Sequence, residues 1–340
     1  MKIVQLLDEH LWREFVDNHS QGQIFHTPEM FQVFARAERH RATLWAAVGD
    51  DGQVLALLLP VQITLLNGPL RYFTTRAIVY SSALCAPGSQ GQMALATLLD
   101  AYKRQVKEAP LFTELRNLSD LSDVQPVLKE SGFTYQEHLN YLIDLDQPEE
   151  TLWRNISKSG QKNLRKSFNK GAMVEAITER QKLPIVYELL RKIYSRVQVP
   201  LAPLSLFEAA FDVLSPRGML KVFVTSIEGH WTGARLVLLY KGRIIDWYAG
   251  SDRAFSSYFP NETLVWHVLK WGKEHDFHLF DFGGAGRPDE PYGPREFKSK
   301  FGGTLVNYGR NICVHAPIRL KFSQAGYQLL RRFLWIDKQH

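Results

Sequence analysis

The residues best suited to chemistry begin at the end of an apolar stretch, where the sequence reads Phe-Asp-Phe-Gly-Gly from 280 to 284. An apolar strand that ends in an acid and two glycines is typical of a loop whose backbone approaches another group closely. Asp281 is a candidate catalytic residue that would orient an attacking amine or the loop itself, and a turn-capping aspartate is the alternative. Gly283 and Gly284 are candidate substrate-binding residues, whose backbone N–H groups would help to stabilise an oxyanion.

A lysine between aromatic residues follows in the stretch Phe-Lys-Ser-Lys-Phe-Gly-Gly at 297–303. The ammonium group of Lys298 would stabilise a developing oxyanion by its charge, and the alternative is a surface lysine beside a β-bulge. The intervening loop at 287–294 is rich in turn formers and polar residues and contains Tyr292, a candidate substrate-binding residue. Loops on a rigid scaffold carry much of protein function, so we expect the site here.

The chain lacks the standard patterns of nucleophilic, metal-dependent and nucleotide chemistry. It contains no G-x-S-x-G, H-E-x-x-H or Walker A sequence. Its 11 histidines show no metal-ligand spacing, and its two cysteines, Cys85 and Cys313, cannot form a cysteine zinc site. We therefore expect no metal and no other cofactor, and we favour direct attack of an amine on an activated acyl group.

A second candidate site is a run of cations without acids between 151 and 174. On a helical wheel, Trp153, Ile156, Leu164 and Phe168 fall on one face. The candidate polyanion-binding residues fall on the other: Lys158, Lys162, Arg165, Lys166 and Lys170. Unrelieved like charge lowers helix stability unless an anion meets it. This face therefore predicts a surface for RNA phosphates or anionic lipid, and a solvated basic face is the alternative.

Two similar sets of elements are expected to position these residues. In each half, strands joined by tight turns are followed by an amphipathic helix and another strand. The expected strands are 44–48, 54–63 and 112–118 in the first half, and 220–227, 234–240, 244–249 and 278–282 in the second. The expected helices are about 92–108 and 262–275, the latter with Asn261 as its N-cap. A short helix near 124–129 and a strand through 140–145 would close the first half.

The stretches at 280–284 and 297–303, at this spacing and near the end of a chain of 340 residues, resemble the Fem-type aminoacyltransferases and related GNAT-fold acyltransferases of exopolysaccharide loci. The basic segment supports the resemblance, as do Gly-Phe at 132–133 and Asp-Trp-Tyr-Ala-Gly-Ser at 246–251, which is similar to the family's aromatic strand. The Pro-rich, charge-free stretch at 200–207 resembles the exopolysaccharide-associated branch. Family members that act on the muropeptide nucleotide usually have an arginine and a tyrosine there.

The resemblance implies an α/β (α+β) fold of tandem GNAT-like domains, each a mixed twisted sheet flanked by helices. We expect an N-terminal domain at 1–146, a C-terminal catalytic domain at 147–315 and a basic amphipathic tail at 316–340. The tail would lie on an anionic membrane surface or pack on the protein with its cations outward.

The resemblance also implies roles for individual residues. Lys298 would face the acyl-transfer centre, with the substrate-binding residue Phe297 beside it, and Tyr248 would line the acceptor pocket. The chain would then be an acyltransferase that moves an activated acyl group to an amine of a cell-envelope, glycan or lipid precursor, with aminoacyl-tRNA as one donor.

Two other functions stay open. An acyl-CoA-dependent N-acyltransferase needs a glycine-rich loop around the pyrophosphate, and the corresponding stretch, 251–260, lacks those glycines. The other is a non-catalytic relative that binds membrane or RNA. The residues do not define an oligomeric state.

Composition limits the setting of the protein. With 45% hydrophobic residues, the chain suits two domains that each bury a core. Its net charge of +6 permits an anionic partner. No apolar run approaches the roughly 20 residues that span a bilayer, and the N-terminus does not read as a signal peptide. We therefore expect a cytoplasmic protein, with peripheral contact at the inner face of the membrane as a further expectation.

Overall fold

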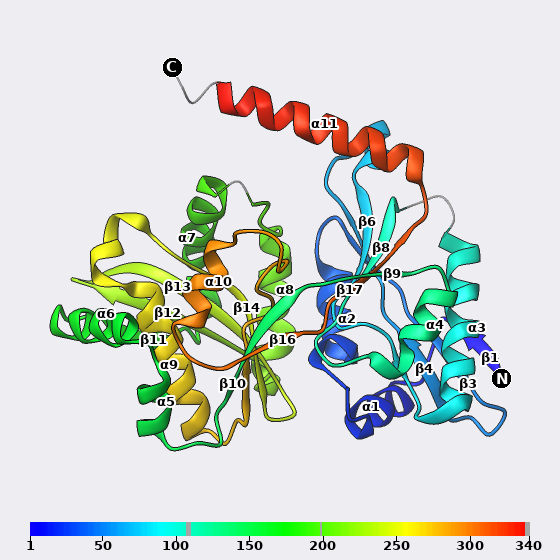
Figure 1. Cartoon of the computed structure of the whole chain (residues 1–340), viewed down its shortest axis with the longest axis horizontal. Helices are drawn as coiled ribbons and strands as arrows, with labels where there is room; N and C mark the ends of the chain where they lie inside the picture. The colour runs from blue at the N-terminus through cyan, green and yellow to red at the C-terminus, as the bar shows by residue number, and fades with distance from the viewer. Residues whose placement is uncertain (107–109, 198, 337–340) are drawn as a thin grey trace. The chain divides into compact units, whose positions relative to one another are not determined.

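The structure, a computed structural model, describes residues 1–106, 110–197 and 199–336, with the side chains of the last helix described as far as 326. The chain divides into two compact units (Figure 1). Unit 1 comprises Met1–Gln136 and Gly309–His340, and unit 2 comprises Glu137–Tyr308. Both combine mixed sheets with flanking helices, which confirms the predicted α/β fold class. Within the described ranges, no helix combines the length and the apolarity needed to cross a bilayer.

Unit 1 contains two sheets. The first has the order β1 (Lys2–Val4), β3 (Trp45–Val48), β4 (Val54–Leu58) and β7 (Leu84–Cys85). The second has the order β2 (His40–Ala42), β5 (Val61–Thr64), β6 (Thr75–Val79), β8 (Phe112–Arg116), β17 (Arg310–Val314) and β9 (Thr134–Gln136). The single strand expected at 54–63 is divided into β4 and β5 because Pro60, which lacks an N–H donor, interrupts the ladder.

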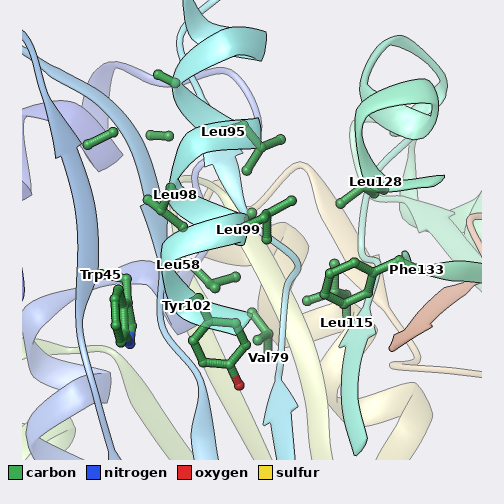
Figure 2. Close-up of a cluster of buried hydrophobic side chains, with 14 of the residues drawn as sticks. Trp45, Leu58, Val79, Leu95, Leu98, Leu99, Tyr102, Leu115, Leu128 and Phe133 are labelled. Atoms are coloured by element: carbon green, nitrogen blue, oxygen red, sulfur yellow. The ribbon is translucent and has the colours of Figure 1, made fainter. Parts of the chain in front are cut away.

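The helices of unit 1 cover these sheets. They are α1 (Glu9–Asn18), α2 (Pro28–Arg36), α3 (Gly88–Val106), α4 (Gln125–Glu130) and α11 (Pro317–Ile336), with the 3₁₀ turns η1 (Ile24–His26), η2 (Gly68–Phe73) and η3 (Ser122–Val124). Figure 2 shows Leu98 and Tyr102 of α3 on the side of Trp45, and Leu95 on the side of Leu128 and Phe133, which belong to the same buried cluster. The predicted tail corresponds to α11, but its side chains from 327 onward and residues 337–340 lie outside the described part.

Unit 2 contains one sheet of seven strands. Their order is β11 (Met173–Ala176), β12 (Leu220–Ile227), β13 (His230–Tyr240), β14 (Arg243–Ser251), β15 (Leu279–Asp281), β10 (Leu139–Asp144) and β16 (Thr304–Asn307). The helices are α5 (Glu149–Asn155), α6 (Lys158–Asn169), α7 (Leu183–Arg196), α8 (Leu204–Leu214), α9 (Pro260–Glu274) and α10 (Gly293–Ser299), with the 3₁₀ turns η4 (Arg180–Lys182), η5 (Ser215–Arg217) and η6 (Arg253–Tyr258). The expected apolar face of α9 is buried through Leu264, Val265, Val268 and Leu269.

Relative to a simple division of the chain into a first and a second half, the two units exchange one strand each. In unit 2, β14 and β15 are parallel and β10 pairs antiparallel with β15. In unit 1, β6 and β8 are parallel, and β17 pairs antiparallel with β8. The strand expected to close the first half, β10, therefore belongs to unit 2, while β17 from the end of the chain occupies the equivalent place in unit 1. Apolar patterning indicates that a segment is a strand but not which of two similar sheets accepts it.

Candidate functional site

A loop leaves the sheet of unit 2 where β14 and β15 diverge. The two strands pair only as far as Ile245 and Asp281, after which β14 continues with β13 as its partner. Gly283 and Gly284 then adopt φ values of +74° and +135°, a region that glycine occupies without strain. A Cβ atom at Gly283 would lie 2.9 Å from the carbonyl oxygen of Asp246. The glycine pair therefore lets the loop pass directly against β14.

Two buried side chains hold this loop. Asp281 is fully buried; its Oδ1 accepts hydrogen bonds from Asn140 Nδ2 at 2.6 Å and from the N–H of Gly283 at 2.7 Å. The N–H of Gly284 donates to Asn140 Oδ1 at 2.9 Å. Burial raises the pKa of Asp281, while these hydrogen bonds and the nearby Arg243 and Lys298 lower it.

This geometry changes two of the predicted roles. The N–H groups of Gly283 and Gly284 are both engaged by side-chain oxygens, so neither is placed to serve the oxyanion as the sequence suggested. Asp281 has an exposed fraction of 0%, and its carboxylate holds the loop through these hydrogen bonds; a role in orienting an amine stays a prediction. Asn140, which the sequence did not single out, completes the arrangement from β10.

Lys298 reaches the same loop from α10. Its Nζ donates to the carbonyl oxygens of Phe282 at 2.8 Å and Gly284 at 2.5 Å. Burial lowers the pKa of Lys298 to about 8; Asp246 and Asp281 oppose this shift. An ammonium group has three N–H donors, so two hold the loop while the third remains for another acceptor. The side chain is partly accessible, which allows that acceptor to come from a substrate.

A buried ion pair lies in the electrostatic field of Lys298. Arg235 of β13 is only 1% exposed, and its Nη1 donates to Asp246 Oδ2 at 2.5 Å. Its Nη2 donates to Asn261 Oδ1 at 2.8 Å. Asn261 is therefore not the predicted N-cap of α9; Phe259 occupies that position, with φ of +54°. The sequence signal for Arg235 was a charge within an otherwise apolar strand.

The aromatic strand carries a β-bulge beside this pair. Asp246 pairs with Val237 and Tyr248 with Leu236, so Trp247 is the extra residue. The Tyr248 ring centroid lies 4.7 Å from that of Phe207 in α8. Tyr248 is partly exposed, as an acceptor-pocket residue must be.

Tyr194 of α7 is a further member that the sequence did not indicate. Its ring centroid lies 6.1 Å from that of Tyr248. Burial, with a contribution from the Asp246 carboxylate, raises the pKa of Tyr194 to about 12. A hydrogen bond with the backbone of Ala249 opposes this shift, and the phenol stays neutral at ordinary pH.

The remaining candidates lie on or just before α10. Phe297 is partly exposed and packs edge-on against Phe301, with ring centroids 5.4 Å apart. Tyr292 precedes the first residue of α10 and is 42% exposed, and a Cβ at Gly286 would lie 2.8 Å from its ring. Hydrogen bonds join Lys298, Asp281, Gly283 and Gly284 into one set, and Phe297 and Tyr292 flank it along α10.

The basic segment forms two helices rather than one. Ser157 interrupts it, and its Oγ caps α6 by accepting from the N–H of Gly160 at 3.1 Å. The five predicted cations, Lys158, Lys162, Arg165, Lys166 and Lys170, are all exposed, and none pairs with a carboxylate within the described ranges. Phe168 is 43% exposed and so does not belong to the buried face with Leu164.

The comparisons with known proteins agree with this fold. Residues 154–299 match the family model of the acetyltransferase (GNAT) domain. A lipid II:glycine glycyltransferase of Staphylococcus haemolyticus (strain JCSC1435) is 20% identical, over 85% of this chain and 87% of its own length. FemX superimposes with a TM-score of 0.71 at 18% identity, covering 97% of this chain and 99% of that one.

A tandem GNAT protein from the clavulanic acid biosynthesis pathway superimposes with a TM-score of 0.56 at 12% identity, covering 92% of this chain and 98% of that one. The GNAT match covers most of unit 2, including β14 with its bulge, β15 and α10, whereas β10 with Asn140 precedes it. The tandem arrangement that the sequence implied is thus confirmed by the fold. These findings support an acyltransferase that contains a GNAT domain and is similar in sequence and fold to the Fem-type aminoacyltransferases.

Proposed function

We propose that this enzyme transfers an activated aminoacyl or other acyl group to an amine of a cell-envelope, glycan or lipid precursor by direct attack. The lipid II:glycine glycyltransferases among its relatives support an envelope acceptor. The observation that carries the proposal is the position of Lys298. Two backbone carbonyls hold its ammonium group beside the point where β14 and β15 diverge. We assign catalysis to the C-terminal domain because this cluster lies entirely within unit 2.

Lys298 acts on the acyl carbonyl in this scheme. Its third N–H donor stabilises the oxyanion that forms when the amine nitrogen attacks the carbonyl carbon. The bond to the donor's leaving oxygen or sulfur then breaks, and the leaving group takes up a proton as the amine loses one. Asp281 and Asn140 act as positioning residues because they fix the loop that holds Lys298.

The surrounding residues would bind the acceptor. Tyr248 and Phe297 offer partly exposed aromatic faces, and Tyr292 offers an exposed ring at the start of α10. Gly283 and Gly284 contribute close backbone approach rather than N–H donation. The reaction as written uses no metal or other cofactor.

An aminoacyl-tRNA is the donor we favour. The exposed cations of α6 and Lys170 supply a face for a polyanion, and no carboxylate in the described part of the chain neutralises it. Positive charge of this kind binds nucleic-acid phosphates with a strong dependence on salt. We place the enzyme in the cytoplasm, with peripheral contact at the inner face of the membrane where a lipid-linked precursor would be met.

The start of α9 argues against acyl-CoA as the donor. A pyrophosphate cradle needs consecutive free backbone N–H groups at a helix N-terminus. Here η6 precedes the helix, the N–H of Phe259 bonds to Ser256, and the first helical residue is Pro260, which has no N–H. We therefore expect no acyl-CoA affinity tighter than about millimolar by calorimetry, and a micromolar saturable signal would favour this donor.

The test of the proposal compares Lys298→Ala with Lys300→Ala, a matched lysine two residues further on. In mass spectra of envelope extracts, a deletion strain should lack an aminoacyl or acyl mass. Lys300→Ala should restore that mass. Lys298→Ala should lower turnover by about 10²–10³, as expected for the loss of one oxyanion donor. Full activity of a folded Lys298→Ala protein would exclude the assigned role.

A further inference from the structure

Unit 1 carries an apolar turn that does not enter the core. The connection between β5 and β6 runs through η2, and none of its six residues is buried. Five large apolar residues in this turn and its approach are exposed: Leu65, Leu66, Leu70, Tyr72 and Phe73. Contiguous exposed apolar surface on a folded protein marks an interaction site, because soluble proteins otherwise avoid it.

The first turns of α11 extend this apolar surface. Ser323 Oγ donates to the carbonyl oxygen of Phe73 at 2.6 Å, which fixes α11 against η2. Ile318 and Phe322 lie one turn apart on the same face of α11 and are 70% and 66% exposed. Figure 1 shows α11, in red, lying across one end of unit 1 near β6. Two segments far apart in sequence therefore present one surface.

The charged side chains of these two segments are all positive. Arg71 lies within η2, and Arg319 and Lys321 lie between the two exposed apolar residues of α11. There is no Asp or Glu from 53 to 99 or from 315 to 336. An apolar surface interspersed with cations alone is complementary to an anionic lipid bilayer, where aromatic and aliphatic groups enter the interface while Arg and Lys meet the headgroups.

We propose that unit 1 docks on an anionic bilayer through this docking surface. It comprises Leu65, Leu66, Leu70, Tyr72, Phe73, Ile318 and Phe322 with the cations Arg71, Arg319 and Lys321. The proposal rests on the proposed function, since it assigns the peripheral membrane contact to a surface of unit 1, and no residue of the site in unit 2 takes part. Docking by a turn and the start of a helix is shallow and reversible, which suits an enzyme that must sample many lipid-linked acceptors.

Vesicle co-sedimentation tests the proposal with the full chain. The wild type should bind vesicles of phosphatidylcholine with phosphatidylglycerol far better than phosphatidylcholine alone. The double variant Leu70→Glu/Phe322→Glu should abolish binding. Arg71→Gln/Lys321→Gln should weaken it about fivefold for each cation removed and reduce its salt dependence. The matched control Met93→Glu replaces an apolar side chain that is 67% exposed on α3 and should bind normally.

Three outcomes would overturn the proposal. Unchanged binding by both double variants would place any membrane contact elsewhere, for example on α6, which Lys162→Glu/Lys166→Glu would reveal. Failure of the wild type to bind anionic vesicles would exclude a bilayer as the occupant. A smaller oligomer of Leu70→Glu/Phe322→Glu than of the wild type in analytical ultracentrifugation, without vesicle binding by the wild type, would identify a self-interface. Circular dichroism of each variant controls for folding, and acyl transfer to a soluble amine separates this test from that of Lys298.

Discussion

The ammonium group of Lys298 is held by neutral carbonyls rather than by a carboxylate. A carboxylate partner would keep the lysine pKa high and neutralise its field, whereas Phe282 and Gly284 supply only dipoles. Burial then lowers the pKa to about 8. The positive charge is therefore present at neutral pH; Asp246 and Asp281 act on it through the field, but within the described residues no carboxylate forms an ion pair with it.

The pH profile of transfer follows from this pKa. If protonated Lys298 is the active form, kcat/KM corrected for the fraction of deprotonated acceptor amine should fall as pH rises through about 8. Lys298→Arg should be slower but should keep its rate into more alkaline solution, because arginine retains its proton. Steady-state rates between pH 6 and 10 measure both. A flat wild-type profile through this range would show that the charge of Lys298 is not used.

Side-chain roles near the glycine loop were only partly predictable from residue type. The spacing of Asp281, the paired glycines and Lys298 correctly indicated residues that meet in space. The partner choices of Gly283 and Gly284 depend on Asn140, which arrives from β10 more than a hundred residues earlier. A local pattern cannot show which long-range side chain captures a backbone N–H.

At the scale of elements, the bulge at Trp247 turns β14 into the scaffold of the site. Without it, strict alternation would place Asp246 and Tyr248 in a continuous ladder with β13. The extra residue locally increases twist and re-aims the side chains on either side. The strand itself was predictable from its apolar and aromatic residues, but the bulge was not, because it depends on the register with β13.

The basic face of α6 is the second element with a measurable role. Replacing Lys162 and Lys166 with glutamate should weaken donor binding sharply and flatten its salt dependence, since each lost phosphate contact removes about 0.7–0.9 from the log–log slope. Thermal stability should stay the same or rise, because like-charge repulsion is relieved. Filter binding of aminoacyl-tRNA across a salt series gives the slope.

The matched control is Lys129→Glu/Lys192→Glu, which changes the charge equally at two exposed helical lysines elsewhere. Equal loss of affinity in the control would show that net charge alone, and not the α6 face, governs binding. Unfolding of the α6 variant would indicate that its lysines are needed for the fold. Lost vesicle binding with unchanged tRNA affinity would make the face a membrane contact.

At the scale of the whole molecule, one sheet in each unit contains a strand that lies far in the sequence from the strands on either side of it. Unit 1 places β17 between β8 and β9, and unit 2 places β10 between β15 and β16. The two halves were recognisable in the sequence as similar sets of elements. The exchange was not, because both sheets offer the same kind of place to a strand of the same pattern.

Truncation tests the dependence of unit 1 on β17. A chain ending at Tyr308 should lose the cooperative melting of unit 1, because β8 and β9 lose their shared partner and Cys313 leaves the core. A chain ending at Ala316, which keeps β17 and lacks only α11, should retain it. Calorimetry and limited proteolysis distinguish the two. Identical melting of both chains would show that β17 adds little to unit 1.

The strand exchange also sets the order in which the newly made chain can mature. Domains usually fold as units, N-terminal first, while synthesis continues. Here the ribosome has released all of unit 2 before residues 310–314 emerge, so the sheet of unit 1 waits with β8 and β9 unjoined. Unit 2 gains its last strand, β16, only a few residues before β17 emerges. The edges of β8 and β9 are therefore open to chaperones or to neighbouring chains for nearly the whole time in which unit 2 is made.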